Sequence, residues 1–135
     1  MISVIEFIQR VERNSDVRIF IDQFADNDEC AFYIPEEKAI GINPAISDND
    51  AIVSIVHEVA HHVDISAHPD RRDIDGEIIA HAVEGIIISN EPVEGIIEEY
   101  EQDVREAYFF NGVVSIDEDD ISEVVAQVRA IISDF

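Results

Sequence analysis

The sequence has a single cysteine, few basic residues and no long apolar run. Cys30 has no partner for an internal disulfide, which agrees with a reducing, intracellular setting. Apolar stretches such as residues 85–88 are far shorter than the ~20 residues that cross a bilayer, so no membrane association is expected. The first six residues lack a basic segment and already contain Glu6, unlike a secretory signal. We therefore expect a cytoplasmic protein.

Positive charge is scarce in this chain. Lysine and arginine together number 8 against 31 aspartates and glutamates, which gives a formal net charge of −23. Direct nucleic-acid binding is disfavoured, because phosphate contacts need clustered basic side chains. The chain is nevertheless 47% hydrophobic, which is typical of a folded protein rather than a disordered tail. Its 135 residues fit one domain, residues 1–135, with enough length to bury a core.

The basic residues are also unusual in kind, because Lys38 is the one lysine beside seven arginines. An acid-rich and lysine-poor composition predicts a halophilic protein. In molar salt the Debye length falls to about 3 Å, so carboxylates on the surface no longer repel one another strongly. The alternative is a mesophilic acidic protein whose surface charge serves solubility alone.

Hydrophobic periodicity predicts an α+β fold with more helix than strand. Ser3 and Glu6 form a capping-box signature ahead of a short amphipathic helix that ends at Asn14. β-branched and aromatic residues then predict a strand and a hairpin, which together form a small antiparallel sheet. The strands are expected at residues 17–21, 30–34 and 39–42, with the hairpin turn at 35–38.

Four further helices are predicted after the sheet. In each of them apolar residues recur at helical spacing, and turn-forming residues such as Pro69 and Asn111 separate one helix from the next. The expected bounds are about 49–65, 73–89 and 92–110, with the last helix capped by Asp120 and Glu123.

All five histidines fall between positions 57 and 81, and residues 57–61 have the HExxH arrangement. On a helix, residues four apart lie about 40° apart and one turn further along, so His57 and His61 can face one metal ion. Glu58 is expected to face the open coordination position, where its carboxylate takes a proton from water. Chance placement of this motif has an expectation of roughly 0.02 per chain, so the pattern predicts a zinc site.

A catalytic zinc site needs a third protein ligand and leaves the fourth position to water. The next predicted helix carries Glu77, His81 and Glu84 on one polar stripe, at i, i+4 and i+7. His68 is a weaker alternative, because metzincin-like spacing would need the histidine one position earlier. His62 points about 100° away from His61 and is expected at the surface or at the edge of the core.

Glu77 is the favoured third ligand. It lies near the start of its helix, just after Gly76 and close to the turn at 69–70 that lets this helix fold back across the metal helix. Ala80, one turn later, allows the two helices to approach closely. His81 would then act as a hydrogen-bonding neighbour of a ligand histidine, and a three-histidine site with His81 as third ligand is the main alternative.

This combination resembles the gluzincin metallopeptidases, in which a glutamate from the next helix joins HExxH. It is most similar to the small ImmA/IrrE-type metallopeptidases, whose second motif reads E-x-x-A-N-x-F-A followed by an aliphatic pair. Glu77 and Ala80 stand in register with that motif, Val83 and residues 87–88 follow it approximately, and His81 stands where asparagine is usual. The resemblance covers about residues 30–90.

The resemblance implies a zincin-like fold in which His57, His61 and Glu77 hold Zn²⁺ and a substrate peptide lies along an edge strand of the hairpin. The sequence therefore predicts a zinc metallopeptidase that hydrolyses protein or peptide substrates, with Glu58 as general base. Two alternatives stay open: an acidic interaction protein, such as a nucleic-acid mimic, and an inactive zincin with a structural zinc. Oxyanion stabilisation is open among Tyr33, Tyr100, Tyr108, Arg71, Arg72 and Arg105. The oligomeric state is left open.

Overall fold

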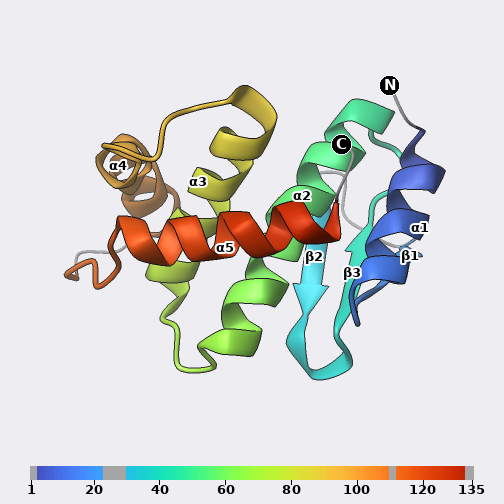
Figure 1. Ribbon diagram of the computed structural model, residues 1–135, viewed down its shortest axis with the longest axis horizontal. Coiled ribbons are helices and arrows are strands. Elements are labelled where there is room, and N and C mark those ends of the chain that lie inside the picture. The colour runs from blue at the N-terminus through green and yellow to red at the C-terminus, as the bar shows by residue number, and fades with distance from the viewer. Residues whose placement is uncertain (1–2, 23–29, 110–111, 133–135) are drawn as a thin grey trace.

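The computed structural model describes residues 3–22, 30–109 and 112–132. These residues form five α-helices, a 3-10 turn and a three-stranded sheet, so the predicted α+β class is confirmed in its coarse form (Figure 1). The helices are α1 (Val4–Asn14), α2 (Asp48–Ala67), α3 (Asp73–Ser89), α4 (Ile96–Tyr108) and α5 (Glu118–Ile131). Among the described residues, no helix has both the length and the apolar character that a membrane span requires.

The sheet contains the strands β1 (Arg18–Ile21), β2 (Ala31–Ile34) and β3 (Ala39–Ile42), in the order β1-β3-β2. β2 and β3 form the expected antiparallel hairpin, but β1 pairs parallel to β3, so the prediction of an antiparallel sheet is wrong for β1. The chain reverses direction between successive strands, and β1 and β3 therefore run the same way. Because β3 lies between the other two strands, both β1 and β2 are sheet edges.

The hairpin turn consists of a 3-10 turn at Pro35–Glu37 followed by Lys38 in the left-handed conformation, with φ 49°. Gly41 in β3 is required by its surroundings, since a Cβ there would meet the phenyl rings of Phe32 and Phe20. These two rings, from opposite edge strands, meet edge to face with centroids 5.9 Å apart.

Capping residues set the helix ends near the predicted positions. Ser3 Oγ accepts a hydrogen bond from the Glu6 amide, and Ser47 Oγ accepts one from the Asp50 amide at the start of α2. α3 ends at Asn90, which adopts the left-handed conformation that commonly terminates helices.

The starts of the last two helices differ from the prediction. α5 is capped by a reciprocal pair of Asp117 and Asp120, three residues earlier than the predicted pair of Asp120 and Glu123. α4 begins at Ile96 instead of Pro92, because Gly95 has φ 78°, which a right-handed helix cannot contain. The end expected near residue 110 lies outside the described residues; the helix is described as far as Tyr108.

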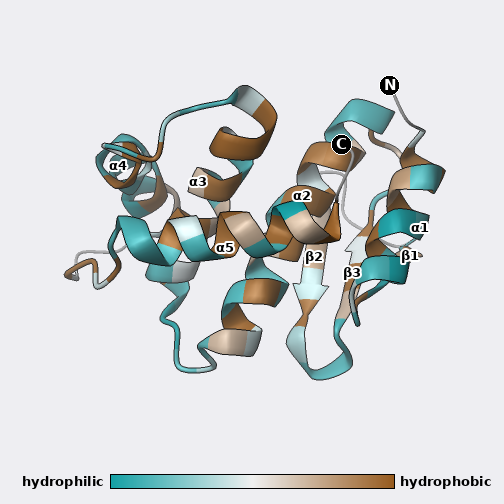
Figure 2. Cartoon of the chain, in the orientation of Figure 1, coloured by the Kyte–Doolittle hydropathy of each residue, from teal (hydrophilic) through white to brown (hydrophobic). Residues whose placement is uncertain are grey.

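The core lies where α2, α3 and α5 meet, and α5 crosses in front of α2 and α3 in Figure 1. α2 also contacts β2 and β3, whereas α1 contacts β1 and α2. Ala80 is completely buried, as the expected close packing of α3 on α2 requires. Figure 2 shows hydrophilic residues on the outer sides of α1, α4 and α5. This packing fixes the relative positions of α2 and α3, the two helices that carry the histidine and glutamate cluster.

Candidate metal centre

The carboxylate of Glu77 on α3 faces the imidazoles of α2. His61 Nε2 lies 2.9 Å from Glu77 Oε1, and His57 Nε2 lies 3.5 Å from Glu77 Oε2. The rings of His57 and His61 meet edge to face with centroids 5.0 Å apart, as one helical turn between them requires. The three residues favoured from the sequence thus lie side by side, across the contact between two helices.

His81 belongs to the same cluster. Its Nε2 lies 3.7 Å from Glu77 Oε2, and its ring centroid lies 4.7 Å from that of His57. Two overlapping groups could hold a metal ion with ligand atoms within 4.8 Å of one another: one contains His57, Glu77 and His81, the other His57, Glu58 and His61. His57 is common to both groups, and Glu77 reaches from one group to the other through its contact with His61.

Two carboxylate oxygens in this cluster are buried without a hydrogen-bond partner among the described residues. They are Oε2 of Glu58 and Oε2 of Glu77. Glu58 is only 9% exposed, so water compensates little of the cost of burying its charge. An unpaired buried carboxylate costs about 1–3 kcal/mol or more, and a cation bound between these groups would remove that cost. The residues of this cluster are therefore chemically suited to bind a divalent metal ion.

Electrostatics divide the two glutamates into different roles. For Glu77, burial opposes ionisation, but the close contacts with the imidazoles of His57 and His61 outweigh it and hold the pKa well below its usual range. For Glu58, burial dominates and raises the pKa, against the opposing charges of His61 and His57. Glu77 is thus a stable anion, as a ligand must be, and Glu58 is the more basic carboxylate.

The contact with Glu77 also shifts the pKa of His61. Burial lowers the pKa of its imidazole, but the hydrogen bond to Glu77 and the charges of Glu77 and Glu58 outweigh burial and raise the pKa overall. A metal ion that binds Nε2 of His61 must therefore displace a proton over part of the neutral pH range.

The cluster opens into a cleft of about 430 Å³. The lining includes His57, Glu58, Glu77, His81, Glu84, Tyr108, Cys30, Ala31 and Ser54. The whole polar stripe of α3 thus faces the cleft, as its i, i+4 and i+7 spacing predicts. Cys30, Ala31 and Ser54 carried no signal in the sequence, since small side chains near a metal motif form no pattern.

Tyr108 is the candidate for oxyanion stabilisation that lines this cleft. It lies in the last turn of α4, which packs on α3 and so brings the phenol to Glu77. Burial and the negative charge of Glu77 raise the pKa of Tyr108 to about 12, so the phenol keeps its proton at neutral pH. Tyr100, one of the other candidates, donates to Glu91 at 2.7 Å and stacks on His81.

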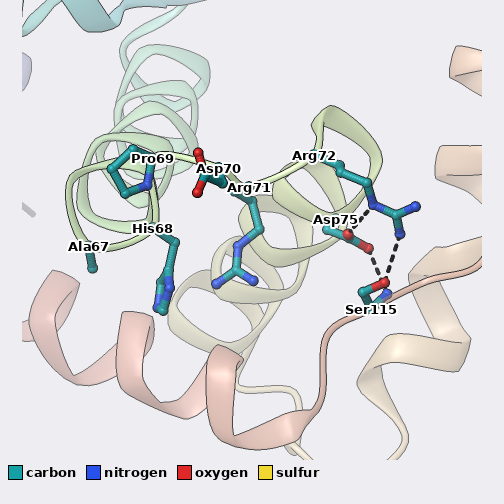
Figure 3. Close-up of a pocket in the computed structure, with 8 residues that line it drawn as sticks. All are labelled: Ala67, His68, Pro69, Asp70, Arg71, Arg72, Asp75 and Ser115. Carbon is teal, nitrogen blue, oxygen red and sulfur yellow. Dashed lines mark hydrogen bonds and ion pairs between the residues drawn. The ribbon is translucent and has the colours of Figure 1, made fainter.

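His68 lies elsewhere, at a second cavity of about 490 Å³ beside the turn between α2 and α3 (Figure 3). Arg71 and Arg72 also line this cavity. Arg71 binds the buried Asp64 through Nε and Nη2, and Arg72 Nε donates to the buried Asp75 at 2.9 Å.

Asp75 also accepts a hydrogen bond from the backbone amide of Ser115, and Arg72 reaches Ser115 Oγ and the Val113 carbonyl. These hydrogen bonds of Arg72 and Asp75 therefore connect the segment before α5 to the start of α3. The structure separates His68 from the cluster on α2 and α3.

His62 is buried at 4% exposure, on the side of α2 that faces β2. Its Nδ1 lies 2.6 Å from the hydroxyl of Tyr33 in β2, and its Nε2 lies 2.7 Å from Asp16 Oδ1. Asp16 in turn accepts from Lys38 at 2.9 Å. These polar contacts tie the edge strand β2 and the hairpin turn to the helix that carries HExxH.

No model of a known protein family, no curated protein and no solved structure matches this chain. The resemblance to the gluzincins therefore stays a prediction from two sequence motifs.

Proposed function

We propose that the protein is a zinc-dependent metallopeptidase. The observation that carries this proposal is the contact of one carboxylate, that of Glu77, with the imidazoles of His57 and His61, beside the buried and unpartnered oxygen of Glu58. Two imidazoles and a carboxylate form a ligand set that catalytic zinc sites use, and such a site keeps one position for water. His57, His61 and Glu77 would hold the ion.

Zinc, when bound, supplies a Lewis acid that lowers the pKa of water and polarises a peptide carbonyl. Glu58 then performs the proton transfers. Its carboxylate takes a proton from the attacking water, whose oxygen forms a bond to the carbonyl carbon. As the carbon–nitrogen bond breaks, Glu58 passes that proton to the leaving amine nitrogen. The raised pKa of Glu58 in the metal-free cluster favours the first of these transfers, because a more basic carboxylate accepts the proton more readily.

Tyr108 would act on the carbonyl oxygen. A protonated phenol that lines the cleft can donate a hydrogen bond to this oxygen as negative charge develops on it.

The edge strand β2 offers a site for an extended substrate. Ala31 of this strand and the preceding Cys30 line the cleft, and β2 pairs with β3 along one side. Its other side is a sheet edge, on which backbone groups of a peptide can pair as an added strand. The contact between Tyr33 and His62 holds this strand against α2.

Hydrolysis of a mixed library of fluorogenic peptides tests the proposal. The zinc-loaded protein should cleave at least some members, a strong chelator should abolish cleavage, and Glu58→Gln should bind zinc without cleaving. A zinc-loaded protein that cleaves no peptide, or a Glu58→Gln variant as active as the parent, would contradict it.

A second candidate is a structural zinc site closed by His81. It is favoured by one observation, namely that the atoms of His57, Glu77 and His81 also form a group within metal-binding reach. Four protein ligands leave no position for water, and such sites stabilise the fold without hydrolysis. Substitution of His81 separates the candidates: in a structural site it should weaken zinc binding as much as Glu77→Ala does, whereas in the catalytic site it should weaken binding less than Glu77→Ala does.

A further inference from the structure

We infer that the cleft accepts peptides with a lysine or arginine side chain within about three residues of the scissile bond, and that Glu84 binds this side chain. The inference rests on the proposed peptidase function and specifies its substrate class. It follows from the charge balance of the cleft, the position of Glu84 and the size of the surrounding side chains.

Among the described residues, the lining of the cleft contains three glutamates and no lysine or arginine. Two of them, Glu58 and Glu77, offset the two positive charges of a bound zinc ion. Glu84 then leaves the cleft with an excess negative charge that faces the substrate. In a partly desolvated cleft, such a charge favours a cationic partner and disfavours an anionic one.

Glu84 lies seven residues after Glu77 on the same face of α3, about 10 Å further along the helix axis. This distance corresponds to about three residues of extended peptide. Its side chain is 27% exposed, and its Oε2 lies 3.8 Å from His81 Nδ1, beyond hydrogen-bond distance. The carboxylate is therefore accessible from the cleft and well placed to accept from an ammonium or guanidinium group.

The cleft differs from an ordinary acidic surface in two respects. Glu58 lines the cleft, and one of its carboxylate oxygens is buried without a hydrogen-bond partner among the described residues. An oxygen in this state points to a ligand at this position. The residues that α2 and the start of β2 contribute to the lining include three small side chains, those of Cys30, Ala31 and Ser54. The cleft, at about 430 Å³, has room for a long side chain.

The overall charge of −23 also attracts cationic peptides, but this effect has a different range. At about 1 M salt the Debye length is roughly 3 Å, so steering by the whole surface is lost while a direct contact largely survives. Selection by Glu84 is therefore expected to persist in molar salt, and a preference caused by the net charge is not.

The test uses three fluorogenic peptides that differ only in a Lys, Gln or Glu at one position close to the cleavage site. They are hydrolysed by the zinc-loaded wild type, Glu84→Gln, Glu84→Lys and the control Glu123→Gln, at 0.1 and 2 M KCl. Glu123 is exposed on α5 and does not line the cleft. Zinc content is measured for every variant, so that loss of metal is recognised.

The wild type and Glu123→Gln should prefer the Lys peptide to the Gln peptide by about tenfold in kcat/KM at both salt concentrations, as expected for a charge-assisted contact. Glu84→Gln should lose this ratio, and Glu84→Lys should reverse the order of the Lys and Glu peptides. Binding gives a readout without turnover: the Lys peptide should bind zinc-loaded Glu58→Gln about tenfold more tightly than it binds Glu58→Gln/Glu84→Gln.

Retention of the Lys preference in Glu84→Gln would overturn the inference. So would a wild-type preference that vanishes in 2 M KCl, since it would then belong to the net charge. A wild type that cleaves all three peptides equally overturns the role of Glu84 and leaves the peptidase intact. Failure to cleave any peptide refutes the peptidase itself.

Discussion

Substitution of Glu77 tests how α3 contributes to the metal centre. Its carboxylate lies 2.9 Å from His61 Nε2 and 3.5 Å from His57 Nε2, so Glu77→Ala removes the group that both imidazoles share. Zinc sites with four protein ligands bind with about 10–16 kcal/mol, or roughly 2.5–4 kcal/mol for each ligand. At about 1.4 kcal/mol per factor of ten, we expect Glu77→Ala to weaken zinc binding by roughly 10²–10³-fold.

His81→Ala should cost less. His81 Nε2 lies 3.7 Å from Glu77 Oε2, and we expect the histidine to orient the ligands, so its loss should weaken binding by about 10–100-fold. The assay is a competition titration of zinc between each variant and a chelator, with Glu123→Ala as a control that should match the wild type. A greater loss in His81→Ala than in Glu77→Ala would refute Glu77 as third ligand and favour a site built from three histidines.

The titration should be run at about pH 8, because Glu77 also affects proton competition. In the metal-free protein it raises the pKa of His61, and Glu77→Ala therefore makes His61 easier to deprotonate. Near neutral pH this change would partly conceal the loss of the ligand. Proton competition weakens as the pH rises, so the difference measured at higher pH reports more of the ligand itself.

Four further predictions concern catalysis, stability and charge. Glu58→Gln should keep zinc but lower kcat by at least ~10²-fold, because the amide cannot accept a proton; residual activity within tenfold of wild type would exclude the role of general base. Asp64→Ala should lower the free energy of unfolding in urea by about 3–5 kcal/mol, because Arg71 loses a buried bidentate partner, and a loss below ~1 kcal/mol would show that the pair is unimportant. Asp16 has its pKa lowered from 3.8 to about 2 by Lys38 and His62, so it stabilises the fold above pH 4 and this contribution disappears as the pH falls towards 2. Since Asp16 is 61% exposed, Asp16→Asn should cost less than ~1 kcal/mol at pH 6 and progressively less as the pH falls through the folded pKa, and a constant difference in urea unfolding would contradict this. The melting temperature should rise from dilute buffer to molar KCl through screening of the net charge of −23, and a flat or falling series would remove the halophilic interpretation.

The HExxH helix and the following helix are predictable from the sequence for definite physical reasons. The spacing of His57 and His61 fixes their common face once the segment is helical, and the apolar residues around them make it helical. Ser47 caps the start of α2, and Asn90 caps the end of α3. Both belong to residue types with strong preferences for these positions. The contact of Glu77 with both imidazoles required only that these two helices pack together.

Other features depend on contacts that a linear pattern does not contain. The parallel direction of β1 follows from β3 lying between β1 and β2, which depends on the packing of α1 and α2 around the sheet. The start of α5 was misplaced because residues 117–120 offer several acidic caps, and only the backbone conformation selects Asp117. Tyr108 reaches the cleft through the packing of α4 on α3, so the sequence alone could not separate it from the other tyrosines.

An anomalous-difference map at the zinc absorption edge, from crystals of the zinc-loaded protein, tests the proposed metal centre most directly. We predict one peak per chain within coordination distance of Nε2 of His57, Nε2 of His61 and a carboxylate oxygen of Glu77, with a fourth position not taken by a protein atom. No peak between α2 and α3, or a peak that His81 closes as a fourth protein ligand, would contradict a catalytic zinc site.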